Sequence, residues 1–127
     1  MVQGVERRKF PRAYFTVKDG ITAVLELPGP EKFTMSTNIL SISEGGISFI
    51  GQREALEGFT SEDEILLVRC IEPEELRFLH SVVMQIRHTI DEPGMKHIVC
   101  GCQFVNISLE QRCGVYKFVE SILDDSN

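Results

Sequence analysis

The sequence predicts an all-β domain with one C-terminal helix, folded as a six-stranded antiparallel β-barrel. Apolar residues recur at every second position along most of the 127-residue chain, which is the period of a half-buried strand. Polar turns rich in Pro, Gly and Asp separate these segments with no helical pattern between them, so neighbouring strands are expected to pair antiparallel. A helical period appears only at the end of the chain. Closing the sheet into a barrel removes exposed strand edges.

Six segments carry the strand pattern. The first runs from Phe15 to Leu27 and is interrupted at Lys18-Asp19-Gly20 by a bulge or a break, because Asp-Gly favours a turn. The other five cover residues 32–42, 47–51, 65–71, 76–90 and 97–105. The last two are joined at Pro93-Gly94, a pair that suits a type II turn. Residues 52–64 are polar and predict a loop with room for one helical turn.

The end of the chain changes to a helical period. Ser108 is a candidate N-cap, and Gln111 three residues later completes a capping box. An apolar stripe follows, formed by Val115, Phe118, Val119 and Ile122. The pattern predicts a helix over about 108–123 that seals the barrel. The same stripe could instead pair with a second copy, so a monomer and a homodimer both stay open.

Charge is distributed unevenly over the chain. Four of the 13 basic residues and one of the 19 acidic residues lie within 1–12, which leaves nine basic and eighteen acidic residues in the remainder. An acidic body excludes duplex nucleic acid as a general partner, whereas a basic arm suits a small anion. No apolar run approaches the ~20 residues that span a bilayer, and no apolar region of a secretory signal follows the N-terminal charges. We expect a cytoplasmic protein.

The cysteines and histidines do not predict a metal site or an active site. No CxxC pair is present, so reduced, buried thiols are the expectation, and burial within the strands is expected of the histidines too. Nucleophile elbows and phosphate-binding loops are also missing from the sequence, so we expect no enzyme and no cofactor. The residues concerned are Cys70, Cys100, Cys102, Cys113, His80, His88 and His97.

Two clusters have the side chains to bind a ligand. In the first, Arg8 and Arg12 lie four apart, and Pro11 keeps the segment extended so that both planar guanidinium groups can surround one phosphate. In the second, residues 41–46, Ser43 offers a hydroxyl and Gly45-Gly46 permits positive φ and close approach of a ligand to the backbone. Alone, the first cluster would be a solvated basic terminus and the second a plain hairpin turn.

The order of the two clusters resembles the PilZ domain family. That family has an RxxxR arm followed about thirty residues later by a (D/N)xSxxG strand and turn. The motif pieces here are Arg8-Lys9-Phe10-Pro11-Arg12 and Ser41-Ile42-Ser43-Glu44-Gly45-Gly46. Gly101-Cys102-Gln103-Phe104 is similar to the GxxF of the family's final strand. The resemblance covers nearly the whole chain, with an arm at 1–12 and one barrel domain at 13–124.

The resemblance implies a receptor for the bacterial second messenger cyclic di-GMP. It implies that Arg8 and Arg12 contact phosphate and guanine and that Arg7 assists them. We further hypothesise that the arm is mobile without ligand and closes on the barrel when ligand binds, so that a new surface forms for a partner protein. Amide protons of residues 4–12 should then gain protection from exchange.

The second motif departs from the family at its first position. Ser43 and Gly46 match the family and would shape the contact with the nucleotide, but Ser41 stands where the family has Asp or Asn. Loss of one charge-assisted hydrogen bond would weaken binding about ten- to a hundredfold. The alternative is therefore a protein-interaction module with the PilZ fold that binds no nucleotide and acts in pilus or flagellar regulation.

Overall fold

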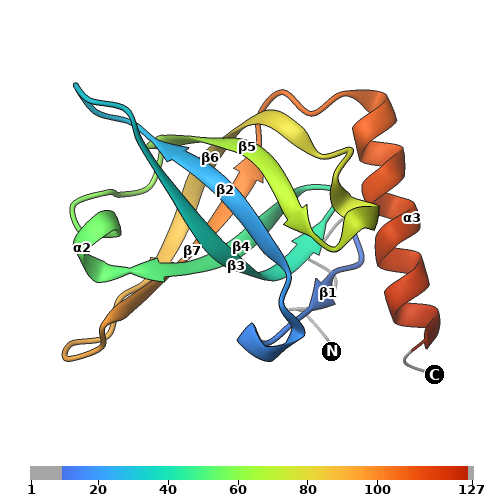
Figure 1. Ribbon diagram of the computed structural model, residues 1–127, viewed down its shortest axis with the longest axis horizontal. Coiled ribbons are helices and arrows are strands. Elements are labelled where there is room, and N and C mark those ends of the chain that lie inside the picture. The colour runs from blue at the N-terminus through green and yellow to red at the C-terminus, as the bar shows by residue number, and fades with distance from the viewer. Residues whose placement is uncertain (1–9, 126–127) are drawn as a thin grey trace, which may run out of the picture.

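The computed structural model describes residues 10–125 and contains a closed antiparallel barrel (Figure 1). Its strands are β2 (Thr22–Leu27), β3 (Phe33–Ser43), β4 (Gly46–Gln52), β5 (Glu64–Glu72), β6 (His80–Ile90) and β7 (His97–Phe104). They are hydrogen-bonded in the order β3-β2-β5-β6-β7-β4, and pairing of β3 with β4 closes the barrel. The predicted six-stranded barrel is confirmed.

A short strand before the barrel pairs with the end of β3. The first half of β3 pairs with β2, whereas its end pairs with the two-residue strand β1 (Ala13–Tyr14), where Tyr14 lies opposite Ser41. Between β1 and β2 the chain makes the 3-10 helix η1 (Val17–Asp19), which ends at Gly20 with φ of 67°. The predicted break at Lys18-Asp19-Gly20 is confirmed, and it lets the chain move from β1 to β2 along the same neighbour.

The core is built from alternate residues of every barrel strand. Along β2, for example, Ala23, Leu25 and Leu27 are buried and the residues between them are half-buried. The largest fully buried side chain is Phe49 of β4. The period-two pattern therefore gave the inward face of β2 correctly, as expected for side chains that alternate across a sheet.

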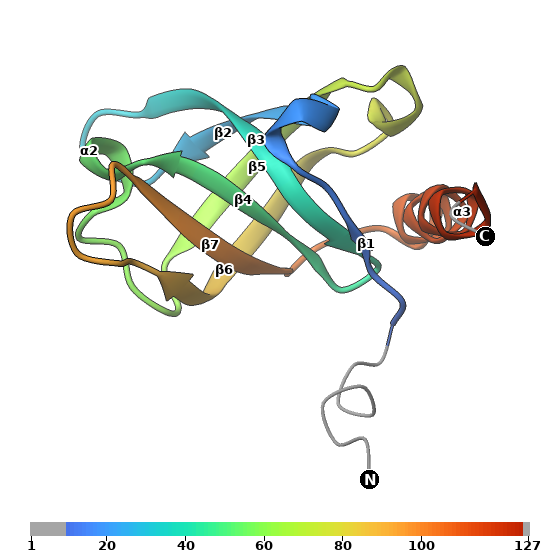
Figure 2. The same ribbon diagram turned by 90° about the horizontal axis from the view of Figure 1, so that it is seen from below.

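The C-terminal helix α3 (Leu109–Asp125) packs against β1, β3 and the 3-10 helix η2 (Glu74–Leu76). Its predicted capping box is confirmed, because the backbone N–H of Gln111 donates to Ser108 Oγ at 3.0 Å and that of Ser108 donates to Gln111 Oε1 at 3.1 Å. Within the predicted stripe, Val115 and Val119 are buried against the barrel. Figure 2 views α3 end-on beside the barrel.

Three features of the sequence were interpreted wrongly. The strand expected at 76–90 begins only at His80, because η2 and the turn after it occupy the preceding residues. Cys113 is exposed on the outer face of α3 rather than buried, although the other three cysteines are buried as expected. All three histidines are exposed. His80 and His97 are the first residues of β6 and β7, at the rim of the barrel.

The connections between strands follow their turn signals. The polar segment 52–64 contains one helical turn, α2 (Arg53–Leu56), as predicted. At the β6–β7 connection Gly94 has φ of 86°, and the N–H of Met95 donates to the carbonyl of Glu92, as a β-turn with glycine at its second central position requires. In the described residues, no helix is both long and apolar enough to cross a bilayer.

Candidate functional site

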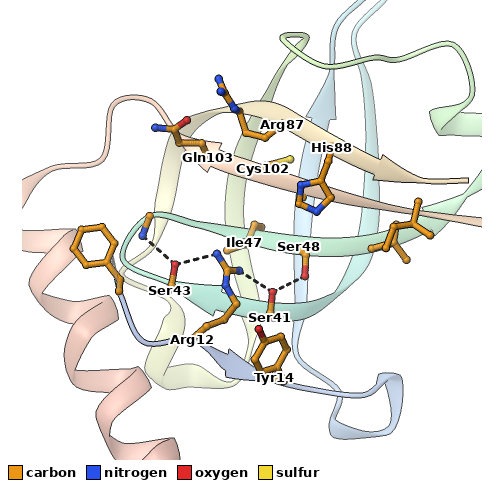
Figure 3. A pocket seen from close by; sticks show the side chains of 15 residues that line it. Arg12, Tyr14, Ser41, Ser43, Ile47, Ser48, Arg87, His88, Cys102 and Gln103 are labelled. Carbon is orange, nitrogen blue, oxygen red and sulfur yellow. Dashed lines mark hydrogen bonds between the residues drawn. The ribbon is translucent and has the colours of Figure 1, made fainter. Parts of the chain in front are cut away.

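Arg12 lies over the end of β3 and is joined to it by two side-chain hydrogen bonds. Its Nη1 donates to Ser41 Oγ at 2.8 Å and its Nη2 donates to Ser43 Oγ at 3.2 Å (Figure 3). Strand β1 sets this geometry, because its pairing with β3 brings the residue before Ala13 alongside the two serines. The structure therefore brings together three of the residues that the sequence predicted as a site.

An extra residue in β3 turns the serines outward. From Ile39 to Ser41 strand β3 advances two residues, while its partner β4 advances only one, from Phe49 to Ser48. Such a β-bulge shifts the alternation of side chains, so that Ser41 faces away from the core although Ile39 faces into it. Ser41 and Ser43 are nevertheless only 3% exposed. Ser41 Oγ also shares a hydrogen bond of 2.5 Å with Ser48 Oγ.

The two glycines of the hairpin turn have a different role from the one expected. Neither Gly45 nor Gly46 uses the positive φ that glycine permits. Gly46 is required for space, because a Cβ there would lie 1.9 Å from the carbonyl oxygen of Cys102 in β7. Gly46 does not line the pocket described below, whereas Gly45 does, and Gly45 N–H donates to Ser43 Oγ at 3.1 Å.

A pocket of about 470 Å³ opens beside Arg12. One wall comes from Phe10, Arg12 and Tyr14 with the serines of β3 and β4, and the opposite wall comes from β6 and β7. Figure 3 shows that the second wall presents Arg87, His88, Cys102 and Gln103. None of the described residues that line the pocket carries a carboxylate, although the chain has a net charge of −6. The pocket is therefore suited to an anion.

A second group of contacts connects the arm, the hairpin turn and α3. The guanidinium carbon of Arg112 lies 4.8 Å from the centre of the Phe10 ring, within cation–π range. Arg112 Nε also donates to Glu44 Oε1 at 3.3 Å. Arg112, from α3, thus touches the residue just before Pro11-Arg12 and a residue of the turn that holds Gly45.

Burial disfavours the thiolate form of three cysteines. Burial raises the pKa of Cys70 to about 12 and that of Cys100 to about 11. Burial, with a contribution from Cys100, raises the pKa of Cys102 to about 12. Cys102 lines the pocket, but burial leaves so little thiolate at neutral pH that it is a poor nucleophile. Among residues 10–125 no cluster of three His, Cys, Asp or Glu side chains could hold a metal ion.

The comparisons with known proteins place the chain in a family. A model of the PilZ domain matches residues 6–120. The chain belongs to the PilZ domain family. None of the curated proteins matches the sequence.

Solved structures share the PilZ fold of this chain. The PilZ domain of YcgR from Escherichia coli, with c-di-GMP, is 9% identical, has a TM-score of 0.67, and the match covers 94% of each chain. The complex of K. pneumonia MrkH with c-di-GMP is 14% identical with a TM-score of 0.71, and the match covers 94% of this chain and 54% of MrkH. The Bacillus subtilis inhibitor of motility, MotI/DgrA, is 15% identical with a TM-score of 0.66, and the match covers 95% of this chain and 53% of MotI. This chain thus spans about half the length of MotI and MrkH.

The predicted site residues fall into three groups. Arg12, Ser41 and Ser43 meet at the pocket, and Gly46 shapes the turn beside it. Arg7 and Arg8 lie outside the described residues 10–125. Sequence reasoning missed the pocket residues that come from other elements: Phe10, Tyr14, Ser48, Arg87, His88 and Gln103. Their side chains reach the pocket through strand pairing and bulges, for which no local sequence pattern stood out.

Proposed function

We propose that this PilZ domain is a receptor for cyclic di-GMP, which binds in the pocket beside Arg12. The observation that carries the proposal is the guanidinium of Arg12, oriented by Ser41 and Ser43 over a pocket whose lining within residues 10–125 includes no carboxylate. Two of the three solved structures named above contain c-di-GMP, which supports the same ligand here. The volume of about 470 Å³ is in the range of small-molecule sites.

The chemistry of Arg12 suits one phosphate of the dinucleotide. A guanidinium presents N–H donors in a planar fork that matches two phosphate oxygens. The hydroxyls of Ser41 and Ser43 carry no charge, so their hydrogen bonds orient the fork without neutralising it. Orientation before binding reduces the entropy that the ligand contacts must offset. Arg7 and Arg8 would add further cations to this clamp, as the family resemblance implies.

We place the domain among binding modules rather than enzymes. The described lining of the pocket holds no carboxylate that could act as a general base, and its thiol, Cys102, has a pKa raised to about 12 by burial. No cofactor or metal is needed for the proposed role. The cytoplasm is the proposed compartment, because the four cysteines are free thiols and such thiols persist under reducing conditions.

The signal would leave the domain through the contacts of Arg112. A ligand that binds Arg12 contacts the chain two residues after Phe10. The ring of Phe10 packs against the Arg112 guanidinium. Arg112 belongs to α3 and also bonds to Glu44 in the turn after Ser43. Ligand binding and the position of α3 are therefore expected to influence each other, and a partner protein would recognise the changed surface.

The alternative function is a protein-interaction module that binds no nucleotide. It is favoured by Ser41, since a family member with Asp or Asn at this position offers the ligand a stronger acceptor. In this alternative Arg12 would only fasten β1 to β3. The two functions differ in one observable, the affinity of the folded protein for cyclic di-GMP.

Calorimetric titration of the wild type and of Arg12→Ala tests the proposal. The variant should fold, because the hydroxyl of Ser41 keeps its bond to Ser48 and that of Ser43 keeps the N–H of Gly45. We expect the wild type to bind with micromolar or tighter affinity and the variant to lose at least about tenfold, the equivalent of one charge-assisted hydrogen bond.

The matched control is Arg69→Ala, which removes the same charge from an exposed position on β5 away from the pocket. Its affinity should equal that of the wild type. Equal losses in the two variants would mean that net charge, rather than the Arg12 site, drives binding. Absence of binding by the folded wild type would favour the interaction module.

A further inference from the structure

The wall of the pocket opposite Arg12 contains an imidazole with no structural task of its own. His88 lines the pocket and is exposed, and within residues 10–125 it forms no hydrogen bond or ion pair. Figure 3 shows its ring projecting from β6 across β7 toward Ser48 of β4. The position of this ring depends on two separate features of the barrel.

The first feature is a β-bulge in β6. Val82, Met84 and Ile86 point into the core at alternate positions, so an unbroken strand would bury the side chain of His88 as well. Strand β6 instead advances two residues from Ile86 to His88 while β7 advances one, from Cys102 to Gly101. The extra residue, Arg87, reverses the alternation and turns the imidazole out of the core into the pocket.

The second feature is the glycine on the neighbouring strand. Gly101 lies opposite His88 in the β6–β7 pairing. A Cβ at residue 101 would lie 2.2 Å from His88 Cε1 and 2.4 Å from its Nε2, so the ring occupies the space that any other residue would need. Gly101 has no positive φ, so the backbone itself does not demand glycine. Space for the ring is therefore what the glycine provides.

We propose that His88 is a stacking platform for a guanine base of the ligand, a role that rests on the proposed binding of cyclic di-GMP. Arg12 on one wall takes a phosphate, and the imidazole on the other wall receives the π-face of a base. An exposed aromatic ring with no polar partner is suited to this contact, because stacking on a base needs an accessible face rather than a hydrogen-bond network. His88 belongs to none of the family patterns given above, whereas Gly101 is the glycine of the GxxF pattern.

Substitution of His88 separates stacking from charge. His88→Ala should weaken cyclic di-GMP binding about five- to a hundredfold, the usual loss when an aromatic partner of a base is removed. His88→Phe keeps a ring and removes both nitrogens, so it should retain affinity within a few-fold. Because the stacking contact involves no phosphate, the salt dependence of binding should stay that of the wild type in both variants, whereas Arg12→Ala should reduce it.

A double-mutant cycle that combines Gly101→Ala with His88→Ala tests whether Gly101 provides the space for the imidazole. With His88 present, the methyl group added by Gly101→Ala should displace the imidazole and weaken binding. The atoms nearest to this methyl group all belong to the His88 side chain, which can move. In the His88→Ala background the same methyl meets no ring, so it should cost no further affinity. A purely structural effect of Gly101→Ala would instead weaken binding equally in both backgrounds.

The histidine resonances give a direct readout with internal controls. The chain has three histidines, and the other two, His80 and His97, lie outside the pocket. On saturation with cyclic di-GMP the ring protons of His88 should shift upfield under the guanine ring current, while those of His80 and His97 stay in place.

The outcomes separate the two proposals. Wild-type affinity in His88→Ala, or an unshifted His88 in the saturated protein, would overturn the platform while leaving the Arg12 site intact. Failure of the folded wild type to bind cyclic di-GMP would overturn the platform together with the proposed function.

Discussion

Replacing Gly46 with alanine tests how the β3–β4 turn is fitted against β7. The new Cβ would lie 1.9 Å from the carbonyl oxygen of Cys102 and 2.9 Å from its carbonyl carbon. Both atoms belong to backbone that is paired with β4, so no side chain can rotate away and the two strands must separate. Overpacking of this kind costs about 1–3 kcal/mol, and a clash with fixed backbone belongs at the upper end of that range. The melting temperature should fall by about 10 °C.

Gly45→Ala is the matched control, because it adds the same methyl one residue earlier. There the Cβ would meet Phe10 Cδ2 at 3.5 Å, an ordinary contact, and the backbone has no positive φ. Its unfolding free energy should stay within about 0.5 kcal/mol of the wild type. Urea denaturation followed by circular dichroism measures both variants. Equal midpoints for the two variants would refute the steric explanation of Gly46.

Four further predictions follow from the contacts and the buried thiols described above. Arg112→Ala should lower the free energy of unfolding by no more than about 1 kcal/mol, because the ion pair of Arg112 with Glu44 is partly exposed. The same substitution should weaken cyclic di-GMP binding in a titration. The control is Arg77→Ala, at an exposed position, which should leave binding unchanged. Ser41→Asn should bind cyclic di-GMP several-fold more tightly, since the longer amide offers an acceptor to the guanine N–H edge and leaves the charge of Arg12 unneutralised; equal or weaker binding would contradict this. Brief alkylation of the native protein at pH 8 should modify Cys113 alone, as peptide mass spectrometry would show, while three thiols with raised pKa stay protected: Cys70, Cys100 and Cys102. Because the folded state holds these protons above pH 9, where unfolded thiols lose them, stability should fall as pH rises from 9 toward 12; a constant urea midpoint over that range would contradict it.

The sequence predicts the barrel well because its strands are half-buried and its turns are short. Apolar residues at every second position, such as Ala23, Leu25 and Leu27, indicate which face of a strand meets the core. This signal comes from residues that are close together in the chain. The capping box of Ser108 and Gln111 is local too, and both of its hydrogen bonds are present. The prediction of a strand starting at Leu76 was wrong because the local apolar pattern there does not belong to a strand. An apolar run there serves a 3-10 turn whose buried leucine packs on the core without joining the sheet.

The candidate site could be predicted only in part. Arg12, Ser41 and Ser43 belong to short patterns whose order along the chain was informative, and the structure brings them into contact. The opposite wall was missed because it depends on a bulge at Arg87, which exists only as a difference in register between β6 and β7. Strict alternation predicted a buried His88, and the bulge is the physical reason that this prediction was wrong.

The steric role of Gly46 was likewise hidden from the sequence. Glycine in a turn suggests positive φ, which is a property of one residue. Its actual requirement is the approach of a carbonyl from Cys102, more than fifty residues away in the chain. Contacts across strands that are distant in sequence leave no periodic signal, so they appear only once the pairing of the barrel is known.

The central claim is that the pocket beside Arg12 receives cyclic di-GMP although Ser41 replaces the acidic or amide residue of the family. Calorimetric titration of the folded wild type with cyclic di-GMP tests it most directly. We expect saturable binding with micromolar or tighter affinity, equivalent to about −8 kcal/mol or better. No detectable binding at about 100 μM, a limit of roughly −5.5 kcal/mol, would contradict the claim and leave the domain as an interaction module.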